Sequence, residues 1–559
     1  MTFNNILEKY RKYAFSERDK GDKFERLMAA YLQTDPKYAN LFKKVWLWNE
    51  FPSRKDLGGN DTGIDIVALT NEGDYWAIQC KCYAENTTID KKSVDSFLSA
   101  SSTQFKGEDL KTTRFAHRLW IDTTGKRWSS NAENVILTQN IPVTRLGLFA
   151  LEEAPVQWDK IDQGISGESA RTVKYDTRPH QQIALENTHN HFKEYNRGKL
   201  IMACGTGKTF TALRIAEHET NGKGLVLFLV PSIALIGQTL NEWTAQSINP
   251  INAICICSQP DITKRKKKGQ DADFYSTLDL ALPASTDIDN IIRQFAYYQQ
   301  HGDDGMTVVF STYQSIEVIS RAQNGLQNNI GDESIFDLII CDEAHRTTGV
   351  TLSNEDESAF VKVHDNDFIS GKKRLYMTAT PRLYDPKAKD KAAQEDIYLC
   401  SMDDEAIYGE EIYRIGFGEA VEKNLLTDYK VLILTLSDKD VPPSVQKMIS
   451  DEEQEINSDD ASKLIGCINA LAKQMLGDDG SLRKVDPNPM KRAVAFCSRI
   501  NPTAYSDATA STTIANYFNT VSNEYIESLP EEEQKVRIST EAKHIDGTMS
   551  ATEREELLS

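Results

Sequence analysis

The sequence predicts an α/β protein in which a small N-terminal domain precedes a larger parallel-sheet part. Three observations support this prediction. Residues 65–83, DIVALTNEGDYWAIQCKCY, resemble two short strands joined by a turn, and a helical stretch, FERLMAAYL, precedes them. From about residue 178, apolar strands alternate with helical stretches. Between 200 and 213, a small-residue loop separates an apolar strand from a helix. The length of 559 residues suggests three or four domains.

The composition is that of an ordinary globular protein with a reduced interior. The hydrophobic content of 40% supports packed cores, and the charged N-terminus lacks the apolar core of a signal peptide. The nine cysteines include no CxxC pair, so free thiols and a cytoplasmic location are expected. The net charge is −19, but residues 1–160 are close to neutral. Because a basic groove can lie on an otherwise acidic protein, this charge does not exclude binding to nucleic acid.

The chain divides into blocks without internal repeats. The expected boundaries are a first domain over 1–155, a linker over 156–177, a parallel-sheet domain over 178–400 and a second, similar domain over 401–559. An acidic, helical insertion at about 438–490 interrupts the last domain, and another insertion at about 258–303 contains KRKKK. Too few strands follow residue 491 for a complete domain of this type, so the chain is expected to be part of a longer protein.

The segment LIMACGTGKTFTAL, residues 200–213, is the strongest chemical signal. Backbone N–H groups of Gly205, Thr206 and Gly207 and of the following helix N-terminus would bind phosphate. Lys208 would reach the β- and γ-phosphates, and the Thr209 hydroxyl would hold Mg²⁺. Met202 stands where the strict pattern has its first glycine.

The segment FDLIICDEAH, residues 336–345, supplies the second half of an ATP site. Its apolar residues place Asp342 and Glu343 at the end of a buried strand. Asp342 can hold the Mg²⁺ shell, and Glu343 can orient the attacking water for phosphoryl transfer.

Five segments in order resemble the motifs of superfamily 2 helicases and DNA translocases: RPHQQ, ACGTGKT, DEAH, TAT and AFCSR. The resemblance implies that Gln181 reads the adenine edge and that Thr378 and Thr380 couple the ATP state to DNA. VPSIALIGQTLNEW and FSTYQS look like the family's DNA-backbone segments. The family's arginine-finger segment is expected beyond residue 559, so this fragment is expected to bind ATP but to hydrolyse it poorly.

The hairpin at 65–83 carries a candidate metal-dependent cleavage site. Strand alternation places Gln79 and Lys81 on one face, where they can meet Asp65 of the partner strand. Carboxylate and amide oxygens of Asp65 and Gln79 suit Mg²⁺, and Lys81 supplies a cation near the reacting phosphate. Glu25, in the upstream helix, can add a second carboxylate. A nuclease would usually have Asp or Glu where Gln79 stands.

The longer pattern FERLMAAYL, GGNDTGIDIVAL and YWAIQCKCY resembles the Mrr-type branch of the PD-(D/E)xK nucleases, in which Gln commonly replaces the second acid. This nuclease followed by two RecA-like domains, the second incomplete, is similar to the single-polypeptide Type ISP restriction–modification enzymes. The resemblance implies ATP-driven translocation along double-stranded DNA coupled to Mg²⁺-dependent cutting. It also implies methyltransferase and target-recognition domains after residue 559, and S-adenosylmethionine only with them. It leaves open whether cleavage needs a second copy on the DNA.

Two alternatives remain at this stage. One is a Type I restriction motor subunit acting with separate specificity and methylation subunits. The other is an ATP-gated DNA-binding motor with an inert nuclease-like module. His189 and His191 have no further ligands near them in the sequence, so no metal site is expected there.

Overall fold

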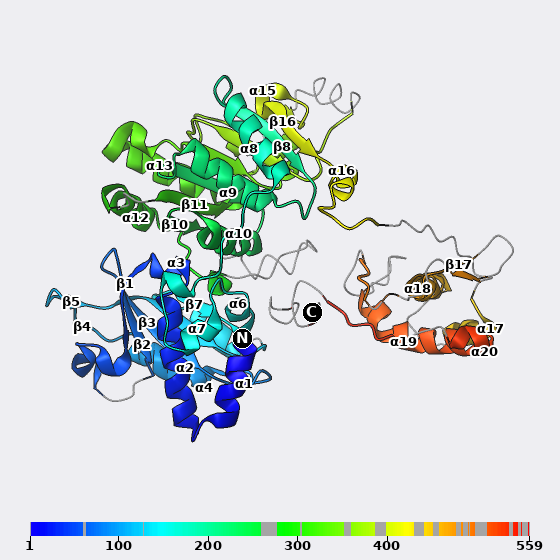
Figure 1. The fold of residues 1–559 in the computed structure, drawn as a ribbon, viewed down its shortest axis with the longest axis horizontal. Coiled ribbons are helices and arrows are strands. Elements are labelled where there is room, and N and C mark those ends of the chain that lie inside the picture. The colour runs from blue at the N-terminus through cyan, green and yellow to red at the C-terminus, as the bar shows by residue number, and fades with distance from the viewer. Residues whose placement is uncertain are drawn as a thin grey trace. The chain divides into compact units, whose positions relative to one another are not determined.

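The structure is a computed structural model of the 559-residue chain, shown in Figure 1. It divides into two compact units, Met1–Thr427 and Asp428–Ser559. The residues it describes are 2–59, 63–126, 128–258, 277–301, 305–351, 359–385, 398–429, 441–450, 458–476, 482–484, 490, 492–497, 511–535, 540–545, 549 and 557.

The N-terminal domain is built on a five-stranded mixed sheet of order β1-β2-β3-β6-β7. The first three strands pair antiparallel, and β3, β6 and β7 pair parallel. The strands are β1 (Phe42–Leu47), β2 (Ile66–Thr70), β3 (Tyr75–Lys81), β6 (Phe115–Asp122) and β7 (Val143–Leu146), and a small hairpin joins β4 (Phe105–Lys106) to β5 (Thr112–Thr113). The hairpin expected within 65–83 is therefore confirmed as β2 and β3.

Helices cover both faces of this sheet. They are α1 (Phe3–Tyr13), α2 (Glu17–Leu32), α3 (Pro36–Ala39), α4 (Lys91–Ala100), α5 (Ser130–Leu137), α6 (Leu148–Glu152) and α7 (Trp158–Asp162). Strand alternation sends Ile78 and Cys80 into the core beneath α1 and α2, while Ala77 faces the core beneath α4 and α5. The sheet is thus buried on both faces.

The segment expected to be a linker, 156–177, is in large part a packed element of the N-terminal domain. Trp158 is 4% exposed and stacks on Tyr31 with ring centroids 5.3 Å apart. Asp162 accepts a hydrogen bond from the Tyr10 hydroxyl at 2.8 Å. Apolar positions spaced along a polar stretch carry this packing, and composition alone does not reveal it.

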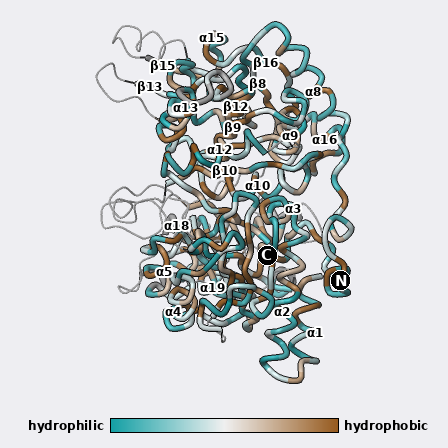
Figure 2. Tube along the Cα trace, turned by 90° about the vertical axis from the view of Figure 1, so that its left-hand side faces the viewer, coloured by the Kyte–Doolittle hydropathy of each residue, from teal (hydrophilic) through white to brown (hydrophobic). Residues whose placement is uncertain are grey.

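The second domain of the first unit contains a seven-stranded sheet of order β10-β11-β9-β12-β14-β8-β16, in which all neighbours are parallel. Its strands are β8 (Arg197–Met202), β9 (Leu225–Val230), β10 (Ile251–Ile256), β11 (Met306–Thr312), β12 (Leu338–Cys341), β14 (Arg374–Thr378) and β16 (Glu410–Ile415). This sheet confirms the predicted parallel α/β architecture. Figure 2 shows hydrophobic segments of the trace running through these strands.

The helices of the parallel-sheet domain lie on the two faces of its sheet. The main ones are α8 (Pro179–His191), α9 (Lys208–Glu219), α10 (Ile233–Gln246), α12 (Ile288–His301) and α13 (Ile316–Ile330). Phe228 faces the core beneath α9 and α10, and its neighbour Leu227 faces the core beneath α12 and α13. Figure 1 shows α8 and α9 side by side across one face of the sheet.

Part of the insertion expected at 258–303 contacts the N-terminal domain. The Tyr38 hydroxyl donates to the Ala281 carbonyl at 3.1 Å, and the Tyr297 hydroxyl donates to the Asn71 carbonyl at 2.6 Å. Leu278 packs in the core beneath α4 and α5. The KRKKK run, 264–268, lies outside the described residues.

The expected boundary between residues 400 and 401 falls inside the first unit. β16 follows that boundary but pairs with β8 in the same sheet, and the compact unit continues to Thr427. A polar strand at a sheet edge has no apolar run to mark it in the sequence.

The described part of the second unit is mainly helical. It contains α17 (Pro443–Ser450), α18 (Ser458–Leu471), α19 (Ser511–Glu527), α20 (Glu531–Gln534) and the hairpin of β17 (Gln474–Leu476) with β18 (Leu482–Lys484). Its core includes Leu464, Phe518 and Val521. The expected second parallel-sheet domain contains the apolar runs KVLILTLS, 430–437, and RAVAFC, 492–497. The first run lies outside the described residues, and the second is described without a strand. A second parallel sheet is therefore absent from the described residues of this unit. None of the described helices in either unit is long and apolar enough to cross a membrane.

Candidate functional site

Asp65 and Gln79 face each other across the β2–β3 hairpin. The antiparallel register pairs Ile66 with Ile78, which sets Asp65 opposite Gln79. The Gln79 side-chain amide donates to Asp65 Oδ2, and the Cys80 backbone N–H donates to the same oxygen at 2.7 Å. Asp65 is 8% exposed and Gln79 is 1% exposed. The carboxylate is therefore held in one orientation by two donors.

The Gln79 amide presents its nitrogen, not its oxygen, to Asp65. Its Oε1 lies towards Gly63, where an added side chain would come within 3.4 Å of Oε1 and 3.1 Å of Ser96 Oγ. Gly63 also has a φ of +88°, which favours glycine. A half turn of the amide would direct Oε1 towards a cation beside Asp65.

Three charged side chains of the predicted site, Asp65, Glu25 and Lys81, act on the thiol of the buried Cys80. Burial raises the pKa of the Cys80 thiol well above its ordinary value, and the negative charges of Asp65 and Glu25 raise it further. The positive charge of Lys81 acts in the opposite direction. Glu25 on α2 and Lys81 on β3 are both half-buried. The fold thus brings Asp65, Gln79, Lys81 and Glu25 to the same end of β3.

Asp122 and Arg145 are part of this region and were missed by the sequence reasoning. Asp122 is the register partner of Lys81 on the neighbouring strand. It forms a two-pronged ion pair with Arg145, from Nε to Oδ2 at 2.8 Å and from Nη2 to Oδ1 at 2.9 Å. Both residues are buried, and each Asp122 carboxylate oxygen accepts a hydrogen bond from Arg145. A charged residue at the end of the apolar run RLWID is the signal that could have indicated it.

The P-loop, residues 203–207, connects β8 to the N-terminus of α9. Gly205 and Gly207 have φ values of +82° and +84°, so the loop needs glycine at both positions. Loop and helix N–H groups in this arrangement fit an anionic phosphate group. Lys208 Nζ lies 3.2 Å from Glu343 Oε1, which joins the two halves of the predicted ATP site. Thr209 follows in the first turn of α9 and is half-buried.

Asp342 is buried at the end of β12. Burial raises the pKa of its carboxyl group from the ordinary value of 3.8 to about 6, although Lys208 acts to lower it. The Glu343 backbone N–H donates to Asp342 Oδ1 at 2.9 Å, and the Tyr313 hydroxyl donates to the Asp342 carbonyl at 2.8 Å. A carboxylate held in this way fits a divalent cation, which would restore its ionised form.

Gln181 and His180 contact the P-loop backbone. Gln181 Nε2 lies 3.5 Å from the Thr206 carbonyl and 3.4 Å from the Gly207 carbonyl, and Gln181 Oε1 accepts from the Arg178 N–H at 2.9 Å. His180 Nε2 lies 2.8 Å from the Thr206 carbonyl oxygen. Gln181 therefore braces the loop, and reading of the adenine edge stays a prediction. His180 was not anticipated, since one buried histidine has no distinctive sequence pattern.

His345 links the DEAH segment to Thr378. His345 Nδ1 lies 3.0 Å from Thr378 Oγ1 and 3.3 Å from Glu343 Oε2. The Thr380 backbone N–H donates to Thr378 Oγ1 at 3.2 Å. Burial lowers the pKa of His345, while Glu343 acts to raise it. The contact connects Thr378 through His345 to Glu343 of the predicted ATP site, whereas Thr380 contacts Thr378 through its backbone and its side chain is exposed.

Polar residues in the two expected DNA-backbone segments make local contacts. Ser232 caps the N-terminus of α10 by accepting from the Leu235 N–H at 3.4 Å. Gln314 Nε2 donates to the Pro231 carbonyl at 3.4 Å and so joins the two segments. Contact with DNA by these segments stays a prediction.

Two family models match the two domains of the first unit. Residues 33–168 match the family described as "Restriction endonuclease" (Mrr_cat_2), and residues 174–383 match the family described as "Type III restriction enzyme, res subunit" (ResIII). The first match extends through α7, in agreement with the packing of Trp158.

Individual proteins are similar to all or to about half of the chain. The chain is similar over its whole length to the ATP-dependent Type ISP restriction-modification enzyme LlaBIII bound to DNA, with 31% identity, a TM-score of 0.74 and coverage of 33% of that protein. It is 26% identical over 289 residues to the probable helicase A859L of African swine fever virus, which spans 52% of this chain and 27% of the relative. It is 25% identical over 317 residues to the Type I restriction enzyme EcoAI endonuclease subunit of Escherichia coli, which spans 55% of this chain and 30% of the relative. The chain thus corresponds to about a third or less of each relative.

Proposed function

We propose that this chain, which joins an Mrr-type restriction-endonuclease domain to a superfamily 2 helicase-like domain as in Type ISP enzymes, is a DNA-cutting motor. Hydrolysis of ATP drives movement along double-stranded DNA, and the Mg²⁺-dependent nuclease cuts that DNA. The observation that carries the proposal is one compact unit containing both the Asp65–Gln79 centre and the Lys208–Glu343 centre.

In the motor, the residues of the P-loop and of the segment around Asp342 have distinct proposed roles. Backbone N–H groups of the loop from Gly205 to Gly207 bind phosphate oxygens, and Lys208 moves from Glu343 to the β- and γ-phosphates. Glu343, released from Lys208, accepts a hydrogen bond from the attacking water and holds it in line with the γ-phosphate. Thr209 and Asp342 would hold Mg²⁺, which supplies charge neutralisation at the phosphates.

In the nuclease, Asp65 is the central acid. Asp65, Gln79 through Oε1 and Glu25 would hold Mg²⁺, which supplies a polarised water and charge stabilisation at the scissile phosphate. Lys81 places a cation beside the same phosphate and can stabilise the charge that develops there. Because Gln79 is neutral, the centre has one carboxylate fewer than the usual pattern, so weak Mg²⁺ binding is expected.

Contacts between the two domains support coupling of DNA movement to DNA cutting. The hydrogen bonds from Tyr38 to Ala281 and from Tyr297 to Asn71 hold the insertion of the motor domain against the nuclease domain. A nuclease held in this way would travel with the motor along DNA.

The test uses the protein that carries this chain, with plasmid DNA, ATP and Mg²⁺. Lys208→Ala is expected to stop ATP hydrolysis, translocation and cleavage together. Asp65→Ala is expected to stop cleavage while ATP hydrolysis and translocation, measured by displacement of a triplex-forming strand, continue. Cleavage that survives both Asp65→Ala and Lys81→Ala would overturn the nuclease assignment. A wild-type protein that hydrolyses ATP on DNA but does not cut it would instead favour an ATP-gated motor with an inert module.

A second candidate is a Type I motor subunit, which the 25% identity to the EcoAI endonuclease subunit favours. Such a subunit would need separate specificity and methylation subunits before it cuts. Cleavage by the purified protein without added subunits would exclude this candidate.

A further inference from the structure

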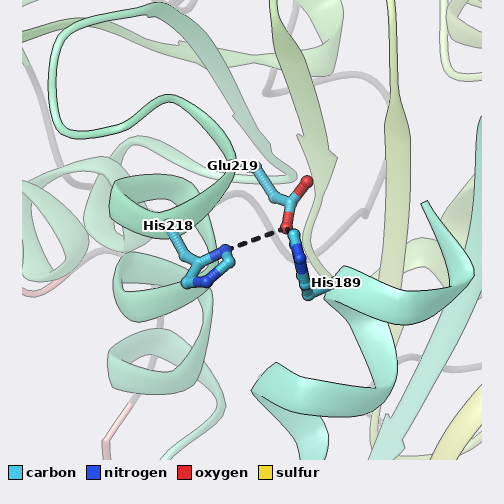
Figure 3. Close-up of side chains that lie close together, drawn as sticks. All are labelled: His189, His218 and Glu219. Atoms are coloured by element: carbon cyan, nitrogen blue, oxygen red, sulfur yellow. Dashed lines mark hydrogen bonds and ion pairs between the residues drawn. The ribbon is translucent and has the colours of Figure 1, made fainter. Parts of the chain in front are cut away.

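Two helices of the motor converge at their C-terminal ends on a cluster of two histidines and a glutamate. His189 lies in the last turn of α8, and His218 and Glu219 end α9 (Figure 3). Helix C-termini carry partial negative charge, so the C-terminus of α8 and that of α9 each favour a nearby cation. The cluster lies at the opposite end of α9 from Lys208 of the ATP site.

The three ligand atoms are spaced as a metal ion requires. His189 Nδ1 lies 3.1 Å and His218 Nδ1 lies 3.3 Å from Glu219 Oε1. One ligand atom from each of the three residues lies within 4.8 Å of the other two. In a tetrahedral zinc site with bonds of about 2.0–2.1 Å, two ligand atoms are about 3.3 Å apart. A small rotation of the His189 or the His218 side chain would therefore bring both imidazoles within bonding distance of one ion.

Glu219 is prepared to act as a charged ligand. Its side chain is 3% exposed, and its Oε2 is bound by Lys373 Nζ at 2.6 Å, which leaves Oε1 directed at the imidazoles. Burial acts to raise the pKa of Glu219, but hydrogen bonds from Lys373 and His189 lower it below its ordinary value. The His189 and His218 side chains are 39% and 45% exposed, so water can reach the remaining coordination position.

We propose that His189, His218 and Glu219 bind a divalent transition-metal ion of the Zn²⁺ class, with water as a further ligand. Imidazole and carboxylate ligands favour Zn²⁺, Co²⁺ or Ni²⁺ over Mg²⁺. The ion clamps α8 to α9, the helices that carry Gln181 and Lys208 at their other ends. His191 stays outside the site because its Nε2 lies 2.7 Å from the Arg197 carbonyl oxygen.

The test measures Zn²⁺ binding to the chelator-treated 559-residue chain by calorimetry and by the rise in melting temperature, without nucleotide. His189→Gln and His218→Gln keep an amide donor for Glu219 but remove a metal ligand. Each variant is expected to lose more than about 100-fold in affinity, since even outer-shell partners are worth about 10–100-fold. The matched control is His301→Gln, an exposed histidine on α12 that should retain wild-type binding.

Co²⁺ as a probe separates this site from the cysteines. The proposed ligands predict weak visible bands of a nitrogen and oxygen site, without the intense near-ultraviolet absorption of a thiolate. Zn²⁺ affinity that is unchanged in both glutamine variants would overturn the proposal, as would Co²⁺ spectra of thiolate type only. If a variant melts earlier without metal, the Zn²⁺-induced rise still decides, because it compares the same variant with and without the ion.

Discussion

Lys208 and Glu343 form a 3.2 Å ion pair between the P-loop and the end of β12. Lys208 is the residue proposed to bind phosphate, and Glu343 is the residue proposed to orient water. In the proposed mechanism Lys208 turns from the Glu343 carboxylate to the phosphates when ATP binds, so the pair engages Glu343 until then.

The first prediction concerns the two members of this pair. Glu343→Gln is expected to retain ATP binding but to lower hydrolysis by on the order of 100-fold or more, because it removes the base. Lys208→Ala is expected to lower both ATP binding and ATP hydrolysis. Nucleotide binding by fluorescence and phosphate release by a coupled assay measure the two effects. Glu317→Gln, which alters an exposed pair with Lys362, is the control. Wild-type hydrolysis by Glu343→Gln would contradict the assigned role.

The second prediction concerns pH and Asp342. Burial raises the pKa of Asp342 from the ordinary 3.8 to about 6, which favours the protonated form. Its contribution to stability is therefore largest at low pH and declines as the pH rises from about 4 to about 6. Mg²⁺ requires the ionised form, so affinity for Mg–ATP should fall as the pH drops below about 6.

The measurement compares binding of Mg–ATP and metal-free ATP from pH 5 to 8, so that protonation of the nucleotide itself is subtracted. Asp342→Asn should bind Mg–ATP weakly and should lose the additional pH dependence. Equal pH profiles for Mg–ATP and metal-free ATP in the wild type would refute this role for Asp342.

The third prediction concerns the neutral residue of the nuclease centre. Gln79→Glu places a carboxylate opposite Asp65 in a buried position, so without metal the two charges repel. We expect a lower melting temperature in EDTA, recovery on adding Mg²⁺, and cleavage at lower Mg²⁺ concentration than in the wild type. Gln163→Glu, at an exposed position of the same domain, should change none of these quantities. Loss of stability that Mg²⁺ does not reverse would argue against metal binding between residues 65 and 79.

The fourth prediction concerns the buried ion pair beside Lys81. Arg145→Met leaves Asp122 buried and unpaired, so the nuclease domain should lose about 3–5 kcal/mol of stability. Tryptophan fluorescence reports this domain selectively, because six of the seven tryptophans lie in it: Trp46, Trp48, Trp76, Trp120, Trp128 and Trp158. Arg114→Met, at an exposed position, is the control. Recovery of stability in the double variant Asp122→Leu with Arg145→Met would attribute the loss to the unpaired carboxylate.

The fifth prediction concerns coupling through His345 and Thr378. Thr378→Val keeps the shape of the side chain but removes the hydroxyl that His345 Nδ1 contacts at 3.0 Å. Stimulation of ATP hydrolysis by DNA should fall several-fold, while ATP affinity stays unchanged. Thr188→Val is the matched control, since the Thr188 hydroxyl only donates to the Ala184 carbonyl within α8. Full stimulation in Thr378→Val would show that this contact does not carry the signal.

Local patterns predicted most of the seven-stranded parallel-sheet domain. A continuous apolar run such as LVLFLV indicates a buried strand wherever it lies, and a glycine loop before a helix is a phosphate site by backbone geometry alone. The edge strand β16 was missed because half of its residues face solvent and, among the described strands, it pairs with β8 alone. The packing of Trp158 was missed for a related reason, since a polar segment can still bury a few widely spaced apolar residues.

The sequence by itself determined the two candidate sites, since short-range spacing places Lys208 after its loop, Asp342 after its strand and Gln79 beside Lys81. Only the tertiary structure decided which distant side chains meet. The pairs Lys208–Glu343 and Arg145–Asp122 join residues far apart in the chain, and their contacts depend on which strands become neighbours. His189 had no ligand near it in sequence, yet the packing of α8 on α9 brings Glu219 to 3.1 Å. Sequence spacing encodes contacts within an element or hairpin, whereas contacts between elements follow from how buried faces pack.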